Sequence, residues 1–139
     1  MARKPQALVL DSWSILAYLE DEPAGRQVAE MIADAHESGA PVMTTVVNAG
    51  EIWYITARET SEDDADRTIL ELAQLGIQFY DADWKLARQA ARFKAGSKMS
   101  FADCFAAALA KERKAELATG DAEFKQVERE IRIGWLQKR

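Results

Sequence analysis

Four acidic residues of this 139-residue chain occupy positions where one fold would bring them together: Asp11, Glu51, Asp103 and Asp121. Asp11 follows an apolar run over residues 7–10 that predicts a buried strand, and Asp121 follows a similar run over residues 116–119. If these strands are parallel neighbours, both aspartates emerge at the carboxyl edge of the sheet, where open α/β folds bind ligands. Clustered carboxylates repel one another, and a hard divalent cation removes that repulsion. The pattern therefore predicts metal-dependent phosphate chemistry at Mg²⁺ or Mn²⁺.

Three of these residues also have an ordinary structural interpretation. Asp11 could cap the helix that follows it, although Ser12 or Ser14 could cap that helix instead. Asp121 could be a turn residue or the cap of a short helix. Asp103 ends the sequence Ser100-Phe101-Ala102-Asp103, which matches a capping box.

Glu51 is harder to explain in this way. Val47 and Ile55, four residues to either side, place Glu51 on an apolar helix face, where carboxylates seldom stand without a partner. Arg58 is a candidate partner, and Asn48 either orients the carboxylate or is only a polar residue of the first turn. If these residues formed no common site, a separate structural explanation would have to be true for each of the four at once. A shared acidic site is therefore the better interpretation.

The rest of the chain predicts the elements that would position these residues. Strands are expected over residues 7–10, 41–44, 77–80, 116–119 and 131–136. Helices are expected after Asp11 and over about 23–38, 45–59, 61–75, 83–95, 100–114 and 121–127. Alternating strands and helices predict a mostly parallel sheet covered on both faces. The length predicts one domain, residues 1–139.

Composition limits the remaining classes of function. The 18 basic and 23 acidic residues give a net charge of −5, which speaks against nonspecific binding to nucleic acid by bulk charge. The single cysteine, Cys104, excludes an internal disulfide, fits a reducing cytosol and is expected in the core. No apolar run approaches the ~20 residues that span a bilayer. We therefore expect a cytoplasmic protein with no membrane partner.

With these residues in view, the chain resembles the PIN-domain ribonucleases and, within them, the VapC toxins of toxin–antitoxin pairs. The resemblance covers essentially the whole length and is carried by four stretches, residues 9–17, 48–52, 100–110 and 117–124. One position departs from the family's pattern, because Trp13 stands where a small residue is usual.

The resemblance implies a three-layer α/β/α fold with a parallel sheet of about five strands. It implies Mg²⁺- or Mn²⁺-dependent cleavage of single-stranded or looped RNA, a homodimer, and a cognate antitoxin that blocks the site. By the same resemblance the acidic site consists of Asp11, Glu51, Asp103 and Asp121, and Ser12 and Thr119 orient its carboxylates. Asn48 is a further supporting candidate because it lies one turn before Glu51. Asp11 and Asp103 are expected to bind one metal directly, Asp121 binds it directly or through water, and Glu51 either holds a second metal or positions the attacking water.

A run of cations without acidic neighbours lies between residues 85 and 98. Such a run is more often a solvated helix face than a binding surface. Its position before Asp103 nevertheless makes its members candidates for RNA contact: Lys85, Arg88, Arg92 and Lys98.

Two other classes of function compete with a nuclease. A catalytically silent PIN-like module would bind RNA or a protein without cutting, but such a protein tends to lose one of the four carboxylates. A receiver domain or a haloacid-dehalogenase-type phosphatase also uses aspartates at strand ends. A receiver needs adjacent acidic residues after the first strand, and the phosphatase needs Asp-x-Asp there. The sequence Asp11-Ser12-Trp13 fits neither pattern.

Overall fold

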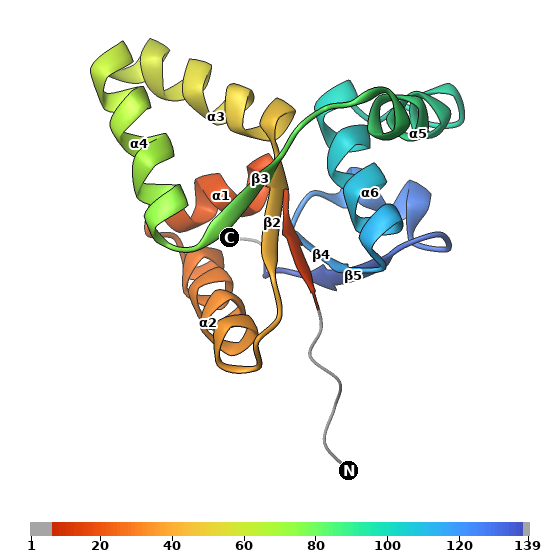
Figure 1. Ribbon diagram of the computed structural model, residues 1–139, viewed down its shortest axis with the longest axis horizontal. Helices are drawn as coiled ribbons and strands as arrows, with labels where there is room; N and C mark the ends of the chain where they lie inside the picture. Colours follow the sequence, from red (N-terminus) through yellow and green to blue (C-terminus); the bar gives the residue numbers. More distant parts are fainter. Residues whose placement is uncertain (1–6, 138–139) are drawn as a thin grey trace.

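The structure is a computed structural model that describes residues 7–137, so both ends of the predicted domain 1–139 lie outside the described residues. Its strands form one parallel sheet in the order β3-β2-β1-β4-β5 (Figure 1). They are β1 (Leu8–Leu10), β2 (Val42–Thr45), β3 (Ile77–Tyr80), β4 (Glu116–Thr119) and β5 (Arg132–Trp135). Helices cover both faces, which confirms the predicted three-layer α/β/α sandwich.

The connecting segments are helical, as the sequence predicted. They are α1 (Ser12–Leu19), α2 (Pro23–Glu37), α3 (Val46–Glu59), α4 (Glu62–Gln74), α5 (Trp84–Ala95), α6 (Phe101–Arg113) and the 3₁₀ helix η1 (Ala122–Val127). Side-chain caps begin most of them: Ser61, Asp83 and Ser100 each accept a hydrogen bond from a first-turn backbone N–H. None of the helices in the described part of the chain could cross a membrane.

The start of α1 corrects one expectation. The N-cap is Asp11, whose Oδ1 accepts a hydrogen bond from the Ser14 backbone N–H at 2.8 Å. Ser12 and Ser14 lie inside the helix and are buried. Asp11 caps because β1 ends at Leu10 and Asp11 keeps an extended backbone, φ −89° and ψ 179°, from which a short side chain reaches the first free N–H groups.

The hydrophobic core has two halves, one on each face of the sheet. Val9 of β1 belongs to the half that contains residues of α5 and α6, whereas Leu8 and Leu10 belong to the half that contains residues of α1 and α2. This alternation follows from the two-residue period of a strand. Helix α6 is buried along most of its length, from Cys104 to Ala110, so the prediction that Cys104 is a core residue is confirmed.

The parallel sheet places the carboxyl ends of its strands at one edge, where α1, α3 and η1 begin (Figure 1). β1 and β4 are direct neighbours, with Leu10 opposite Ala118. The next residues along the two strands are Asp11 and Thr119, so the register brings these two side chains to the same edge. The loop before α6 returns the chain to this edge and adds Asp103 to it.

Candidate active site

Asp11 is fully buried at the carboxyl end of β1. The Thr119 hydroxyl donates a hydrogen bond to Asp11 Oδ2 at 2.6 Å, and the Ser14 backbone N–H donates to Oδ1 at 2.8 Å. Both carboxylate oxygens are therefore held in place. The capping interpretation of Asp11 is correct, and it is compatible with a place in an acidic site because the cap itself orients the carboxylate.

Burial raises the pKa of Asp11 to about 7, because desolvation penalises the charged carboxylate. The hydrogen bonds from Thr119 and Ser14 act in the opposite direction, since they stabilise the ionised form. The negative charge of Asp103 adds to the rise. Asp11 is therefore poised to gain or lose its proton near neutral pH.

Asp103 lies one turn inside α6, where the Ser100 hydroxyl accepts a hydrogen bond from its backbone N–H at 3.1 Å. Burial, together with repulsion from Asp121, Glu51 and Glu123, raises the pKa of this half-buried carboxyl to about 6. The hydrogen bond with Ser100 lowers it. The four carboxylates predicted from the sequence are thus electrostatic neighbours, because each of the other three is coupled to Asp103.

Thr119 connects two of these carboxylates. Its hydroxyl donates to Asp11 Oδ2 and accepts a hydrogen bond from the Asp121 backbone N–H at 3.1 Å. Asp121 Oδ1 in turn accepts from the Glu123 backbone N–H at 2.9 Å, which begins η1. One hydroxyl therefore ties the Asp11 carboxylate to the backbone of Asp121.

Asn48 and Ser12 form a separate buried network beside the carboxylates. The Asn48 amide donates to the Ser12 hydroxyl and to the Ala102 carbonyl oxygen, both at 3.2 Å. Asn48 Oδ1 accepts from the Thr45 hydroxyl at 2.6 Å. These bonds join the starts of α1, α3 and α6, so this network fixes the helices that carry the acidic residues. The Ser12 hydroxyl is engaged by Asn48, whereas Thr119 is the residue that contacts Asp11.

Glu51 is half-buried, one turn inside α3. The Tyr54 hydroxyl donates to Glu51 Oε2 at 3.5 Å. Arg58, the partner considered from the sequence, instead lies over the Tyr54 ring at 4.9 Å from its centre. A tyrosine rather than an arginine therefore stands beside this carboxylate.

Glu123 is an acidic neighbour that the sequence reasoning did not single out. It contributes to the raised pKa of Asp103, and its Oε2 accepts a hydrogen bond from Gln126 Nε2 at 2.8 Å. The Gln126 side-chain oxygen also accepts from the Lys98 backbone N–H at 2.9 Å. The signal in the sequence was the spacing Asp121-Ala122-Glu123 directly after a strand, which places a second carboxylate at the same edge.

The donor set suits a hard divalent cation. The clustered side chains offer only carboxylate oxygens, and their mutual repulsion is relieved by a positive ion. Across residues 7–137, no three acidic, histidine or cysteine side chains stand together in metal-binding geometry. Binding therefore requires a side-chain rotation, for which half-buried Asp103 and Asp121 have room whereas buried Asp11 does not.

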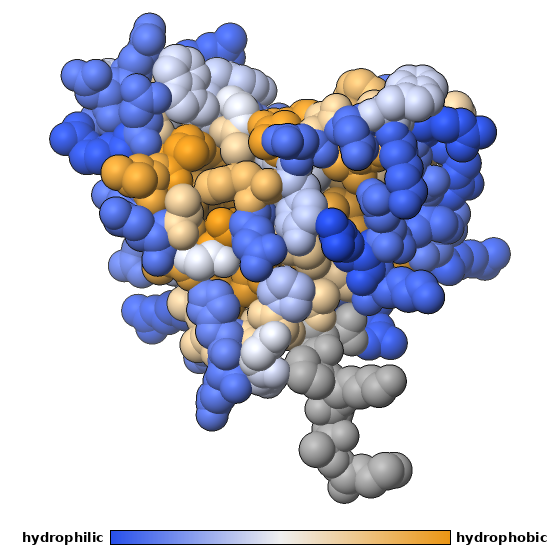
Figure 2. Space-filling view, in the orientation of Figure 1, coloured by the Kyte–Doolittle hydropathy of each residue, from blue (hydrophilic) through white to orange (hydrophobic). Residues whose placement is uncertain are grey.

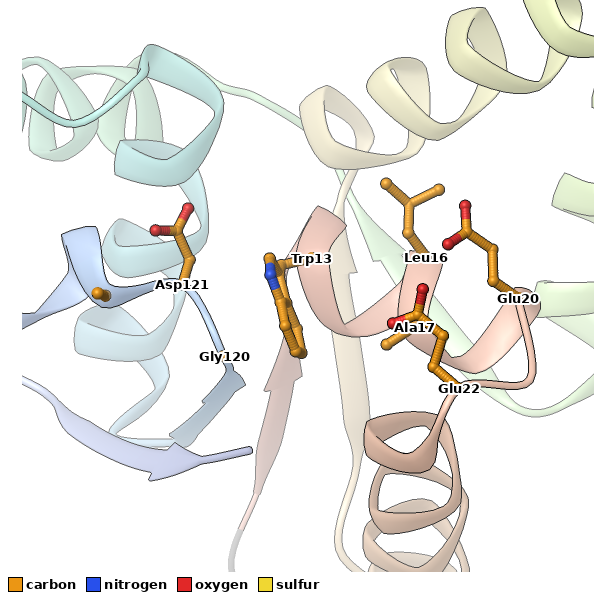
Figure 3. Close-up of a pocket in the computed structure, with 8 residues that line it drawn as sticks. Trp13, Leu16, Ala17, Glu20, Glu22, Gly120 and Asp121 are labelled. Atoms are coloured by element: carbon orange, nitrogen blue, oxygen red, sulfur yellow. The ribbon is translucent and has the colours of Figure 1, made fainter. Parts of the chain in front are cut away.

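A cleft of about 590 Å³ opens beside Asp121 (Figure 3). It lies between α1, the start of α2 and the turn after β4, and it is lined by Trp13, Leu16, Ala17, Glu20, Glu22, Gly120, Asp121 and Ala122. The Trp13 indole packs on Gly120 so closely that a Cβ there would lie 2.6 Å from Trp13 Cζ3. The large residue at position 13 is thus accommodated because residue 120 has no side chain.

The candidate RNA-contact cations, three on α5 and Lys98 in the loop after it, are partly engaged within the protein. Lys85 pairs with Glu112 at 3.3 Å, and Arg92 pairs with Glu130 at 2.7 Å. The Lys98 backbone N–H is held by Gln126. Arg88 is exposed on the same helix. This face therefore carries less available positive charge than the sequence suggested.

Comparison with known proteins identifies the family. The sequence model of the PIN domain matches residues 8–130, which is most of the chain. The chain belongs to the PIN-domain family. No curated protein is matched by its sequence.

Solved structures share this PIN fold at low sequence identity. VapBC2 from Rickettsia felis, bound to a promoter DNA fragment, is 13% identical over 94% of this chain and 99% of that chain, with a TM-score of 0.72. Mycobacterium tuberculosis VapC20, a Sarcin-Ricin loop cleaving toxin, is 19% identical over 86% and 93%, with a TM-score of 0.66. FitAcB from Neisseria gonorrhoeae is 21% identical over 91% and 95%, with a TM-score of 0.63. The resemblance noted from the sequence is confirmed at the level of family and fold.

Proposed function

We propose that this PIN-domain protein is a metal-dependent endoribonuclease and the toxin of a toxin–antitoxin pair. The observation that carries the proposal is the electrostatic coupling among the carboxylates: Asp121 and Glu51 raise the pKa of Asp103, and Asp103 raises that of Asp11. Acidic residues gathered at the ligand-binding edge of a parallel sheet favour a divalent cation. Relatives with this fold include a toxin that cleaves the Sarcin-Ricin loop, which supports RNA as the substrate.

Mg²⁺ or Mn²⁺ is the cofactor that these oxygen donors would select. Asp11, Asp103 and Asp121 would hold the ion, and Glu51 would hold a second ion or position the attacking water. When bound, the ion lowers the pKa of a coordinated water and polarises the scissile phosphate. The protein contributes orientation, because Thr119 holds Asp11 and the Asp121 backbone together, and α6 presents Asp103 to the same edge.

The partners follow from the same family relationship. Solved structures with this fold include a toxin–antitoxin complex and a member of the VapBC family of toxin–antitoxin systems, which supports a cognate antitoxin that covers the acidic edge of this protein. Figure 2 shows apolar patches between the hydrophilic side chains of the surface. Among the exposed apolar residues is Leu70 of α4, which is 57% exposed. We also propose a homodimer and a cytoplasmic location. The RNA would be cut in a single-stranded segment or loop, where bases are free of pairing.

Cleavage of total RNA tests this function. The purified protein should cut RNA in the presence of Mg²⁺ or Mn²⁺, EDTA should abolish cutting, and Asp103→Asn should remove it in a folded protein. Production in bacteria should arrest growth, and Asp103→Asn should relieve the arrest. RNA binding without any cleavage by the wild-type protein, in either metal, would establish the silent binding module instead.

A further inference from the structure

The cleft beside Asp121 differs in character from the acidic edge that it adjoins. Its floor comes from one face of α1, where Trp13, Leu16 and Ala17 follow one another at helical spacing. Its other wall is the turn after β4 that carries Asp121. An apolar surface with a large aromatic ring therefore continues directly from a candidate metal ligand, and the catalytic proposal leaves this surface without a role.

Trp13 is held in one orientation by the turn after β4. Its ring packs on Gly120, where even a methyl group would collide with it. In Figure 3 the indole stands between the turn that bears Gly120 and Asp121 and the part of α1 that bears Leu16 and Ala17. The side chain is only partly buried. A fixed and partly exposed indole is a platform for stacking, since the ring loses little conformational freedom when a ligand binds.

The charges around the cleft select the kind of ligand. Among the residues that the structure describes, the ionisable side chains that line it are Glu20, Glu22 and Asp121, and both glutamates already have interaction partners. None of these described lining residues is a cation that would hold a phosphate, whereas a flat, uncharged ring would meet the apolar surface of Trp13, Leu16 and Ala17 at its faces and the Asp121 carboxylate at its edge. Nucleobases match this description, because their faces stack and their amino groups donate hydrogen bonds.

We infer that this cleft is a nucleobase subsite, in which one unpaired base of the RNA stacks on Trp13 beside the phosphate at the acidic edge. The inference rests on the proposed function for its substrate class. Asp121 belongs to both the cleft and the acidic edge, so a base in the cleft is adjacent to the bond that is cut. Stacking of this kind tolerates different bases, and alanine substitution at a stacking residue typically weakens binding about fivefold or more.

Binding of short single-stranded RNA tests the subsite without depending on cleavage. The protein carries Asp103→Asn, Mg²⁺ is present, and the probes are end-labelled octamers of adenylate, cytidylate and uridylate together with an abasic octamer of the same backbone. At least one base-bearing octamer should bind about fivefold or more tightly than the abasic one. Adding Trp13→Ala should remove that difference, and adding Trp13→Phe should keep most of it.

The matched control is Trp84→Ala, because Trp84 is 74% exposed on α5 and lies outside the cleft. This variant should retain the full difference between base-bearing and abasic RNA. If Trp13→Ala acted only by loosening the fold, it would weaken the binding of base-bearing and abasic octamers equally, and that result would refute the subsite. Melting temperatures of the variants identify such loosening directly.

Two further outcomes distinguish a nucleobase subsite from a cleft that recognises no base and from a cleft that binds a basic protein segment. If base-bearing and abasic octamers bind alike to the parent protein, no base is recognised and the inference is overturned. If Trp13→Ala leaves RNA binding intact but weakens the binding of an oligo-arginine peptide, the cleft recognises a basic protein segment instead. Cleavage of total RNA is measured in a separate experiment. A failed binding test therefore refutes the subsite but not the proposed nuclease, and a failed cleavage test refutes the nuclease independently of the subsite.

Discussion

The Thr119 hydroxyl lies 2.6 Å from Asp11 Oδ2, although the two residues are 108 positions apart in the chain. The contact exists because β1 and β4 are parallel neighbours in register. It lowers the pKa of Asp11 against the stronger effect of burial. A single hydroxyl therefore adjusts the protonation of the most deeply buried carboxyl in the candidate site.

We expect Thr119→Val to raise the pKa of Asp11 further above its present value of about 7, because the ionised carboxylate loses its hydrogen bond. The rise of RNA cleavage with pH should then move to higher pH. The variant should also be about 1–2 kcal/mol less stable, the usual cost of losing such a bond. The measurements are a pH profile of cleavage and urea denaturation. Thr119→Ser retains the hydroxyl and should behave like the wild type, and an unchanged pH profile in Thr119→Val would contradict the assignment.

Asp103→Asn should lower RNA cleavage by about a hundredfold or more, since the metal and water activation would be lost. The fold should remain, because the side-chain volume is kept and Ser100 still accepts from the backbone N–H. Without metal the variant should melt at a higher temperature than the wild type, since one repelling charge is gone. Glu128→Gln, an exposed carboxylate beyond η1, is the matched control for loss of one negative charge. Wild-type cleavage by purified Asp103→Asn would refute the site.

The stability of the metal-free protein should fall as pH rises. The folded-state pKa is raised from 3.8 to about 7 for Asp11 and to about 6 for Asp103. At these two sites the folded protein therefore binds more protons than the unfolded chain between these values, so their contribution to stability is fully present below about pH 4 and is lost as pH rises through about 7. In EDTA the melting temperature should be several degrees lower at about pH 8 than at about pH 5.

Mg²⁺ should reverse this loss, because a cation that binds only the folded, ionised site stabilises it by mass action. Thermal denaturation across pH, with and without millimolar Mg²⁺, measures both effects. In Asp103→Asn the pH dependence should be shallower and the response to Mg²⁺ smaller. A metal-free melting temperature that rises between about pH 5 and about pH 8 would show that these carboxyls are not held protonated.

Arg88→Glu should weaken RNA binding if RNA crosses the α5 face on its way to the acidic edge. Lys85 and Arg92 already pair with Glu112 and Glu130, so Arg88 is the cation to reverse. The effect should be largest at low salt and should shrink as salt rises. Arg26→Glu, an exposed reversal on α2, changes the net charge equally and is the control. Equal losses in the two variants would show that the α5 face has no special role.

Asn48→Ala should destabilise the protein by about 2–4 kcal/mol, because the buried Ser12 hydroxyl loses its donor and the buried Thr45 hydroxyl loses its acceptor, keeping only the backbone N–H of residue 48. It should also reduce cleavage, since the starts of α1, α3 and α6 are no longer tied together. Chemical denaturation and RNA cleavage measure the two effects. Asn48→Asp keeps an acceptor for Thr45 but loses the donors, so it separates the two halves of the network. A fully stable Asn48→Ala protein would show that the network adds nothing to the fold.

The sequence by itself determined the architecture of this protein. Apolar strands alternating with capped helices define a parallel sheet covered on both faces. The predicted bounds of each strand lie within one residue of the bounds in the structure. The sequence also indicated which acidic residues reach the carboxyl edge, because strand ends and first helical turns fix that placement. Pro23, Ser61 and Ser100 marked helix starts correctly, since their effects are local.

Only the tertiary structure decided which partner each side chain has. Thr119 holds Asp11, Asn48 holds Ser12, and Arg92 is neutralised by Glu130. These pairs join segments that are far apart in the chain, so no local spacing reveals them. The raised pKa values of Asp11 and Asp103 likewise arise from burial and from neighbours brought together by the fold. The cleft around Trp13 exists for the same reason, because its two walls meet only where β1 and β4 lie side by side.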